Sequence, residues 1–253
     1  MPTEEKIGLS LIIPAYNEKD RLPVYFHSLI AVLKQLPCKA EVLIVDDRSR
    51  FADQEVYRSL ANEEKDWVKV LSFEENRGKG AAIKAGFQQA QGEWVGFVDA
   101  DGATSAEEVF RLINVAIHSP RDGGRRLGDT KLDAVFGSRI KLLGRAISRS
   151  PVRHATGRIF ATLTARLFNI PVYDSQCGCK FFWKKSFIPV FEESTETGWL
   201  IDVELIALAY RKGLKMLEVP VSWHDVSGSK INLFSDGITM ITGLFRLAQR
   251  LKK

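Results

Sequence analysis

The segment Glu93-Trp-Val-Gly-Phe-Val98 is a short apolar run that ends directly in Asp99-Ala-Asp101. Apolar runs of this length, bounded by turn residues, are typical of buried strands. In an open α/β sheet the two carboxylates would lie at the carboxyl edge, where ligands bind. Mg²⁺ and Mn²⁺ take oxygen ligands, commonly one or two carboxylates plus substrate phosphates. The pair is therefore a candidate site for a divalent cation that carries a diphosphate.

A structural alternative exists for the same segment. Ser105-Ala-Glu-Glu108 makes a good helix start, so the two aspartates could simply belong to a turn that leads into a helix. The other motifs of the chain have to decide between these two interpretations.

Strand and helix patterns alternate through the first half of the chain. Strand patterns occupy residues 9–14, 40–45, 68–73, 93–99 and 134–137. Helix patterns occupy residues 20–36, 53–62, 80–90 and 105–117. This alternation predicts parallel βαβ units, and hence an α/β fold with a Rossmann-like, mostly parallel sheet and helices on both faces.

Length and composition fit one large folded domain. The chain has 253 residues, of which 45% are hydrophobic and 26% charged. Three cysteines cannot pair completely, and the Cys177-Gly-Cys179 spacing is too tight for a zinc knuckle, which indicates a reducing, cytoplasmic environment. No apolar stretch reaches 18 residues and the first residues lack the apolar core of a signal peptide, so we expect a chain that does not cross a membrane by itself.

Positive charge is concentrated between Arg121 and Arg166. Eleven Lys or Arg against three Asp give this segment a net charge of +8, more than the +5 of the whole chain. The cluster indicates an anionic partner such as phospholipid headgroups or a phosphorylated substrate, although a solvated basic face is the common alternative. No nucleic-acid-binding motif accompanies it, so we expect no nucleic-acid partner.

Two amphipathic segments follow. Residues 148–168 predict a helix near which arginines recur every fourth residue at 145, 149 and 153. It could lie in a membrane interface with its arginines at headgroup height, or pack on its own domain as an ordinary amphipathic helix. Residues 231–253 predict a C-terminal amphipathic helix that could contact a membrane surface, a second copy of the chain or a membrane protein.

The polar segments at the predicted strand ends form an ordered set. They are Pro14-Ala-Tyr-Asn-Glu18, Val45-Asp-Asp-Arg-Ser49, Asn76-Arg-Gly-Lys-Gly-Ala-Ala82, Asp99-Ala-Asp101 and Gly137-Ser-Arg139. In this order they resemble the inverting family-two glycosyltransferases with a GT-A fold, and more closely the polyprenyl-phosphate sugar synthases. Four later segments are similar to the dolichyl-phosphate glucose synthase branch: Asp174-Ser-Gln-Cys-Gly-Cys-Lys180, Trp199-Leu-Ile-Asp-Val-Glu204, Glu218-Val-Pro-Val-Ser-Trp223 and Gly228-Ser-Lys230.

The resemblance implies a GT-A domain over residues 1–230 and a metal-dependent hexosyltransferase. It would move glucose from UDP-glucose to a dolichyl or undecaprenyl phosphate with inversion, using Mg²⁺ or Mn²⁺, at the cytosolic face of a membrane as a peripheral protein. The lipid-linked glucosyl phosphate would then serve glycan assembly. Cys179 replaces an aromatic residue common in the glucose branch, which leaves a mannose synthase using GDP-mannose as an alternative. A non-catalytic sugar-nucleotide sensor on the same fold is the other alternative.

The resemblance also implies site residues. The nucleotide-sugar set is Pro14, Ala15, Tyr16, Glu18, Asp46, Arg77, Lys79, Asp99, Ala100, Asp101 and Gln176, with Asp99 and Asp101 as metal ligands. The acceptor-phosphate set is Ser138, Arg139, Arg149, Arg153 and Lys230. The catalytic set is Asp99, Asp101, Arg139 and Asp202.

Physical chemistry adds three expectations about these segments. A phosphate monoester with a second pKa near ~6 is already dianionic at neutral pH, so Asp202 is expected to position a substrate rather than to act as a base. The backbone amides at the start of the helix that follows Asn76 would let a phosphate approach closely. Asp47, next to Asp46, could instead cap the helix that follows it.

Overall fold

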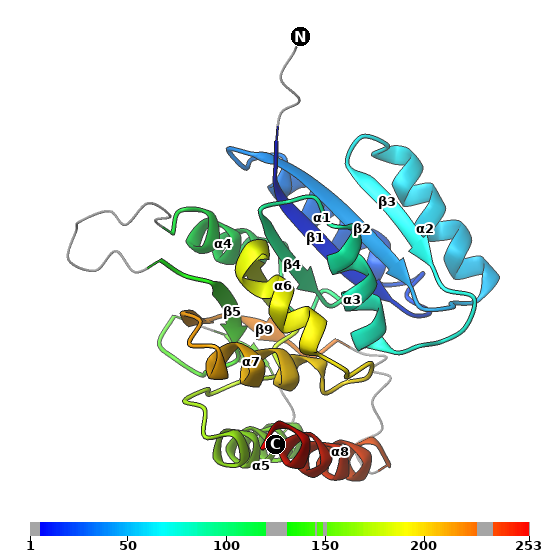
Figure 1. The fold of residues 1–253 in the computed structure, drawn as a ribbon. Coiled ribbons are helices and arrows are strands. Elements are labelled where there is room, and N and C mark those ends of the chain that lie inside the picture. Colours follow the sequence, from blue (N-terminus) through cyan, green and yellow to red (C-terminus); the bar gives the residue numbers. More distant parts are fainter. Residues whose placement is uncertain (1–5, 120–130, 145, 149–150, 227–234, 253) are drawn as a thin grey trace.

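A seven-stranded sheet forms the centre of the molecule, a computed structural model that describes residues 6–119, 131–144, 146–148, 151–226 and 235–252 (Figure 1). The strands are β1 (Ile7–Ala15), β2 (Lys39–Asp46), β3 (Val68–Ser72), β4 (Trp94–Val98), β5 (Ala134–Ser138), β7 (Cys179–Trp183) and β8 (Met216–Pro220), with a separate pair of β6 (Ile147–Ser148) and β9 (Trp223–His224). The helices are α1 (Leu22–Leu33), α2 (Phe51–Glu63), α3 (Lys79–Gln89), α4 (Ala106–Ile117), α5 (Pro151–Phe168), α6 (Lys184–Glu193), α7 (Ile201–Arg211) and α8 (Ser235–Leu251).

The strand order is β3-β2-β1-β4-β7-β5-β8, and every neighbouring pair is parallel except those that include β7. β7 runs antiparallel to both β4 and β5. The predicted α/β fold with a mostly parallel sheet is therefore confirmed. The antiparallel strand β7 was not predicted, because Cys179 and Lys180 were assigned only to a polar motif and the strands that pair with β7 lie far away in sequence.

Helices cover both faces of the sheet, as predicted. On one face, α1, α2 and α4 pack on alternate residues of β1 and β2 in a single apolar cluster. On the other face, α3, α6 and α7 pack on the remaining strand residues. The central strands are buried on both sides, which explains why they are continuous apolar runs rather than alternating ones.

α5 and α8 lie side by side below α7 (Figure 1). Leu244 and Leu247 of α8 are buried against Leu200 and Val203, and apolar residues of α5 complete this third cluster. Each of the two helices also leaves apolar side chains exposed, including Ile159 on α5 and Ile241 and Phe245 on α8. In the described part of the chain, no helix combines the length and the apolarity needed to span a bilayer.

The pairing of β4 with β7 is tight at Gly96. In this register Gly96 lies opposite Phe181 and Phe97 opposite Lys180. A Cβ atom at Gly96 would come within 2.2 Å of the Phe181 ring and 2.8 Å of the Lys180 carbonyl oxygen. Since β7 has no room to move between β4 and β5, the sheet requires glycine at this position.

We expect Gly96→Ala to lower the free energy of unfolding by about 1–3 kcal/mol, because the added methyl group overpacks the centre of the sheet. Gly237→Ala in α8 is the matched control, since a Cβ atom there meets nothing within 4 Å. That change should leave stability unchanged or raise it by up to about 1 kcal/mol. Urea unfolding of both variants measures the difference, and equal midpoints would contradict the tight packing.

Candidate active site

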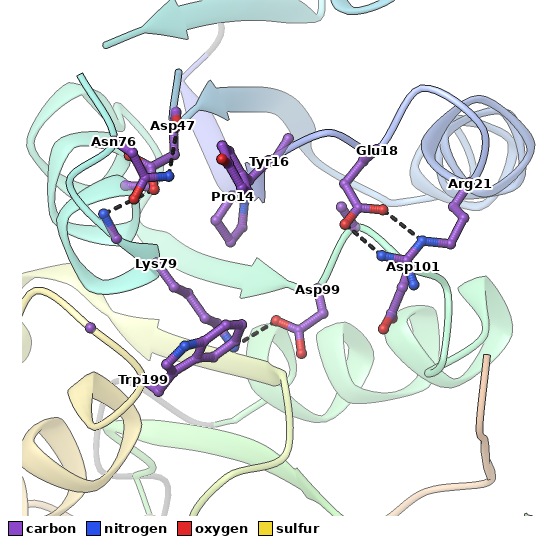
Figure 2. A pocket seen from close by; sticks show the side chains of 15 residues that line it. Pro14, Tyr16, Glu18, Arg21, Asp47, Asn76, Lys79, Asp99, Asp101 and Trp199 are labelled. Carbon is purple, nitrogen blue, oxygen red and sulfur yellow. Dashed lines mark hydrogen bonds and ion pairs between the residues drawn. The ribbon is translucent and has the colours of Figure 1, made fainter. Parts of the chain in front are cut away.

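A cavity of about 410 Å³ opens at the carboxyl ends of β1, β2 and β4 (Figure 2). It is lined by Pro14, Ala15, Tyr16, Glu18, Arg21, Asp47, Asn76, Gly78, Lys79, Ala82, Asp99, Ala100, Asp101, Gly198 and Trp199. Eight of the eleven residues predicted to bind a nucleotide sugar are among them. The other three, Asp46, Arg77 and Gln176, do not line this cavity. The volume fits a small-molecule ligand.

Asp99 and Asp101 enter the cavity from the turn after β4. The Asp99 amide donates to the Gly178 carbonyl at 2.9 Å, which extends the β4–β7 pairing by one residue. A Cβ atom at Gly178 would lie 1.8 Å from the Asp99 carboxylate, so only glycine leaves room for this side chain. Gly102, at a φ of +74°, then turns the chain, and the Ser105 hydroxyl accepts the Glu108 amide at 3.5 Å. The predicted helix start is therefore present beside the carboxylate pair, and the two interpretations of the segment are compatible.

A chain of alternating charges runs from Asp99 into the interior. Lys79 Nζ lies 2.6 Å from Asp99 Oδ1 and 3.6 Å from Asp202 Oδ2, and Lys180 Nζ lies 2.5 Å from Asp202 Oδ1. Lys180 is fully buried and also donates to the Cys177 carbonyl at 2.5 Å. Burial alone would lower the pKa of Lys79, but Asp99 and Asp202 outweigh it and raise that pKa. Lys79 is therefore a permanent cation in the cavity wall.

The two cavity carboxylates suit a divalent cation. Burial, and then the nearby Asp99 carboxylate, raise the pKa of Asp101, which means that the pair resists carrying two negative charges without a counter-ion. One oxygen of Asp101 accepts the Ala103 amide at 3.0 Å, which fixes the side chain in place. In the described residues no group of three or more His, Cys, Asp or Glu could hold a metal, so a cation here would take its remaining ligands from substrate oxygens and water.

Asp46 and Asp47 have different positions from those expected. Asp46 has no exposed surface, and its Oδ1 accepts the Ser49 amide at 2.8 Å. Asp47 faces the cavity, and its two oxygens accept the amides of Arg77 at 2.6 Å and Gly78 at 2.9 Å. The expectation that Asp47 could cap the following helix is wrong, since the N-cap of α2 is Arg50.

The start of α3 differs from the predicted open phosphate loop. The amides of Arg77 and Gly78, which directly precede α3, donate to Asp47. The Ala81 amide donates to the Thr197 carbonyl at 3.1 Å. The Lys79 ammonium thus provides the positive charge that α3 presents to the cavity. Arg77 turns away and places its guanidinium 4.9 Å from the centre of the Phe73 ring.

Sequence reasoning missed Arg21 and Asn76. Arg21 forms a two-point ion pair with Glu18, with N···O distances of 2.7 and 2.5 Å, and it lies on the same side of the cavity as Asp101 (Figure 2). The Asn76 side chain donates to the Asp47 carbonyl at 3.1 Å. The three-residue spacing of Glu18 and Arg21 was the available signal, because residues so spaced lie on one side of a helical turn.

The predicted acceptor residues lie elsewhere, and the structure describes only some of them. Arg149 and Lys230 lie outside the described residues, and Arg153 lies in α5 with its side chain undescribed. Ser138 is fully buried in β5. Arg139 and Gln176 line a smaller hollow together with Arg158 of α5.

Arg139 is already paired. Its Nε and Nη2 atoms donate to the two oxygens of Asp174 at 2.6 and 2.8 Å, and its amide donates to the same carboxylate at 2.9 Å. Burial alone would raise the pKa of Asp174, but the Arg139 guanidinium outweighs it and holds that pKa well below 3.8. The fork of Arg139 that was expected to bind a phosphate is therefore held by Asp174.

Comparisons with known proteins fit this geometry. The family described as Glycosyl transferase family 2 matches residues 10–191. A dolichyl-phosphate beta-glucosyltransferase of Saccharomyces cerevisiae is 34% identical over 249 residues, which cover 95% of this chain and 74% of the relative.

Two solved structures share the fold. The mannosyl-3-phosphoglycerate synthase of Rubrobacter xylanophilus superposes with a TM-score of 0.71 at 17% identity, covering 97% of this chain and 74% of that one. The glucosyl-3-phosphoglycerate synthase of Mycobacterium tuberculosis, in complex with Mn²⁺, UDP-glucose and phosphoglyceric acid, has a TM-score of 0.66 at 14% identity, covering 96% and 80%.

We expect Asp174→Asn to lower the free energy of unfolding at pH 7 by about 2–4 kcal/mol, because the largely buried Arg139 loses its counter-charge. The Asp174 pKa is lowered on folding, so its contribution is complete above the unfolded-state value near 3.8 and is lost as the pH falls toward the folded-state value. The stability gap between the variant and the unmodified protein should therefore narrow below about pH 4. Urea unfolding across pH 3–7 measures it, and a gap that stays constant would contradict the pairing.

Proposed function

This chain belongs to glycosyl transferase family 2, and on that premise we propose that it transfers glucose from UDP-glucose to the phosphate of a polyprenyl lipid, with inversion at the anomeric carbon. One observation carries the proposal. The paired carboxylates Asp99 and Asp101, with the Lys79 ammonium beside them, line the cavity of a chain that matches a dolichyl-phosphate beta-glucosyltransferase over 95% of its length.

The donor would lie along the cavity from β1 to β4. Pro14, Ala15 and Tyr16 border the part nearest β1, where the uracil and ribose would fit, and Asp47 rather than Asp46 lines the cavity. The diphosphate would lie beside the Lys79–Asp99 ion pair, within reach of Asp101. Trp199, on the opposite wall beside Lys79, offers an aromatic face to the sugar (Figure 2).

Asp99 and Asp101 would hold a divalent cation, Mg²⁺ or Mn²⁺, which would neutralise charge that develops on the departing diphosphate. The Mn²⁺ and UDP-glucose in the solved glucosyl-3-phosphoglycerate synthase complex support this assignment. Lys79, which is ion-paired with Asp99, would add a fixed positive charge next to the diphosphate and stabilise the same developing negative charge.

The reaction would be an in-line displacement. An oxygen of the lipid phosphate forms a bond to the anomeric carbon while the bond from that carbon to the diphosphate oxygen breaks, and UDP leaves with the electron pair. The attacking phosphate is dianionic at neutral pH and gives up no proton, so the step needs no general base. Both oxygens of Asp202 face lysines, at 2.5 Å from Lys180 and 3.6 Å from Lys79, which favours a positioning role for this carboxylate.

The acceptor would approach from the side of Arg139, which shares a hollow with Arg158 of α5. Arg149, Arg153 and Lys230 are the further cations that we assign to the lipid phosphate. The exposed apolar residues of the adjoining helices α5 and α8 would rest in the headgroup layer, which makes the protein peripheral on the cytosolic face of a membrane.

A donor screen tests the function. The protein is incubated with a short polyprenyl phosphate, Mn²⁺ or Mg²⁺, and in turn UDP-glucose, UDP-galactose, UDP-N-acetylglucosamine and GDP-mannose. We expect lipid-linked glucosyl phosphate with UDP-glucose and at least about 10-fold less product with each other donor, since one lost or misplaced polar contact costs that much or more. Preferential use of GDP-mannose would favour the mannose synthase, and tight UDP binding without turnover would favour the sensor.

We expect Asp101→Ala to reduce glucosyl transfer at least about 100-fold, which is the typical loss when one group that stabilises developing charge is removed. Asp66→Ala, at an exposed position after α2, is the control and should keep full activity. Initial rates at saturating UDP-glucose measure the effect, with circular dichroism to show that both variants are folded. Turnover retained by Asp101→Ala would remove the metal assignment.

A further inference from the structure

One wall of the cavity is a loop that joins α6 to α7. This wall loop, residues 194–199, contributes Gly198 and Trp199 to the cavity lining. The centre of the Trp199 ring lies 5.9 Å from Lys79 Nζ, and Figure 2 shows the indole beside the Lys79–Asp99 ion pair. The position of this loop therefore decides the shape of the cavity around Lys79.

A single buried carboxylate holds the beginning of the wall loop. Glu204, on α7, has no exposed surface and accepts hydrogen bonds from the Ser194 hydroxyl, the Thr195 amide at 3.0 Å and the Glu196 amide at 2.9 Å. Burial alone would raise the pKa of Glu204, but these bonds and Arg250 outweigh it and lower that pKa. The carboxylate thus stays charged and ties three successive residues to one point.

The middle of the wall loop packs directly on α3. The Thr197 carbonyl accepts the Ala81 amide at 3.1 Å, and Lys84 Nζ donates to the Ser194 carbonyl at 2.6 Å. Cβ atoms at Gly78 and Gly80 would come within 2.5 and 2.7 Å of Thr197 backbone atoms. A shift of the loop would therefore displace the start of α3, which carries Lys79.

The C-terminal helix reaches the same carboxylate. Arg250 of α8 forms an ion pair with Glu204, and its side chain is one-third exposed. α8 also contacts Leu200, the residue after Trp199: a Cβ atom at Gly243 would lie 2.7 Å from the Leu200 side chain. These contacts join the C-terminal helix to the cavity wall through Glu204 and Leu200.

We infer that Arg250 and Glu204 are positioning residues for the donor: through Glu204, the C-terminal helix sets the wall loop so that Trp199 and Lys79 enclose the sugar diphosphate. The inference rests on the proposed function, because it takes the cavity to be a nucleotide-sugar site. Neither side chain lines the cavity, so their effect on the donor is indirect. The nucleoside end, bordered by Pro14 to Tyr16, lies on the opposite side of the cavity from the wall loop (Figure 2).

Calorimetric titration with UDP-glucose and Mn²⁺ tests the inference. Arg250→Met keeps the apolar stem and removes the charge, and we expect the Kd and the KM for UDP-glucose to rise about 10-fold, the order expected when a charged hydrogen-bond donor is lost. The kcat should change by less than about twofold, because the bound donor returns the wall loop to its position. Lys252→Met removes the same charge from an exposed position near the end of α8 and should behave like the unmodified protein.

Two further measurements separate positioning from a general loss of structure. The Kd for uridine should rise much less than the Kd for UDP-glucose in Arg250→Met, since Pro14 to Tyr16 lie on the opposite side of the cavity from the wall loop, and Arg250→Lys should recover part of the affinity for UDP-glucose. If Arg250→Met matches Lys252→Met in affinity for UDP-glucose, or if uridine binding weakens equally, the inference is overturned. A failure of the unmodified protein to bind UDP-glucose would instead overturn the proposed function.

Discussion

Four alternating charges at the carboxyl edge of the sheet organise this protein. Asp99, Lys79, Asp202 and Lys180 come from four different elements, the end of β4, α3, α7 and β7, and each lies beside a residue of opposite sign. Unpaired buried charges are costly, so the elements must meet in one arrangement for the buried members, Lys79, Asp202 and Lys180, to be tolerated. The cavity is shaped by the same arrangement, because Lys79 and Asp99 form part of its lining.

The tight packing of β7 makes this arrangement rigid. Gly96 lets the Phe181 ring lie against β4, and Gly178 leaves the space that the Asp99 carboxylate fills. A site that stabilises developing charge works best when its groups cannot reorganise, because reorganisation costs free energy at the moment of reaction. Glycines behind the carboxylate pair therefore serve the chemistry as much as the fold.

The two sides of the site differ in how their charges are balanced. On the donor side, the burial of Asp101 and its closeness to Asp99 leave negative charge that favours a cation. On the side of Arg139, the buried guanidinium is balanced by Asp174 and fixed by three hydrogen bonds, so this pair acts first as structure. In the proposed function, the attraction of an anionic lipid would depend on the net positive charge of residues 121–166, because long-range attraction does not require a precise geometry.

The sequence by itself determined the βα alternation, the strand that ends at Asp99, the helix start at Ser105 and most of the residues that line the cavity. The first three of these features depend on local periodicity and turn chemistry, which neighbouring residues specify. The lining residues followed from the resemblance of the ordered polar segments to a known family. Only the tertiary structure decided that β7 enters the sheet antiparallel, that Asp47 rather than Asp46 faces the cavity, that Arg139 is paired with Asp174, and that Arg250 reaches Glu204. Each of these depends on contacts between residues that are distant in sequence, or on which side of a strand end faces the cavity. Short-range sequence patterns do not specify such contacts, because the contacts form only when the elements pack together.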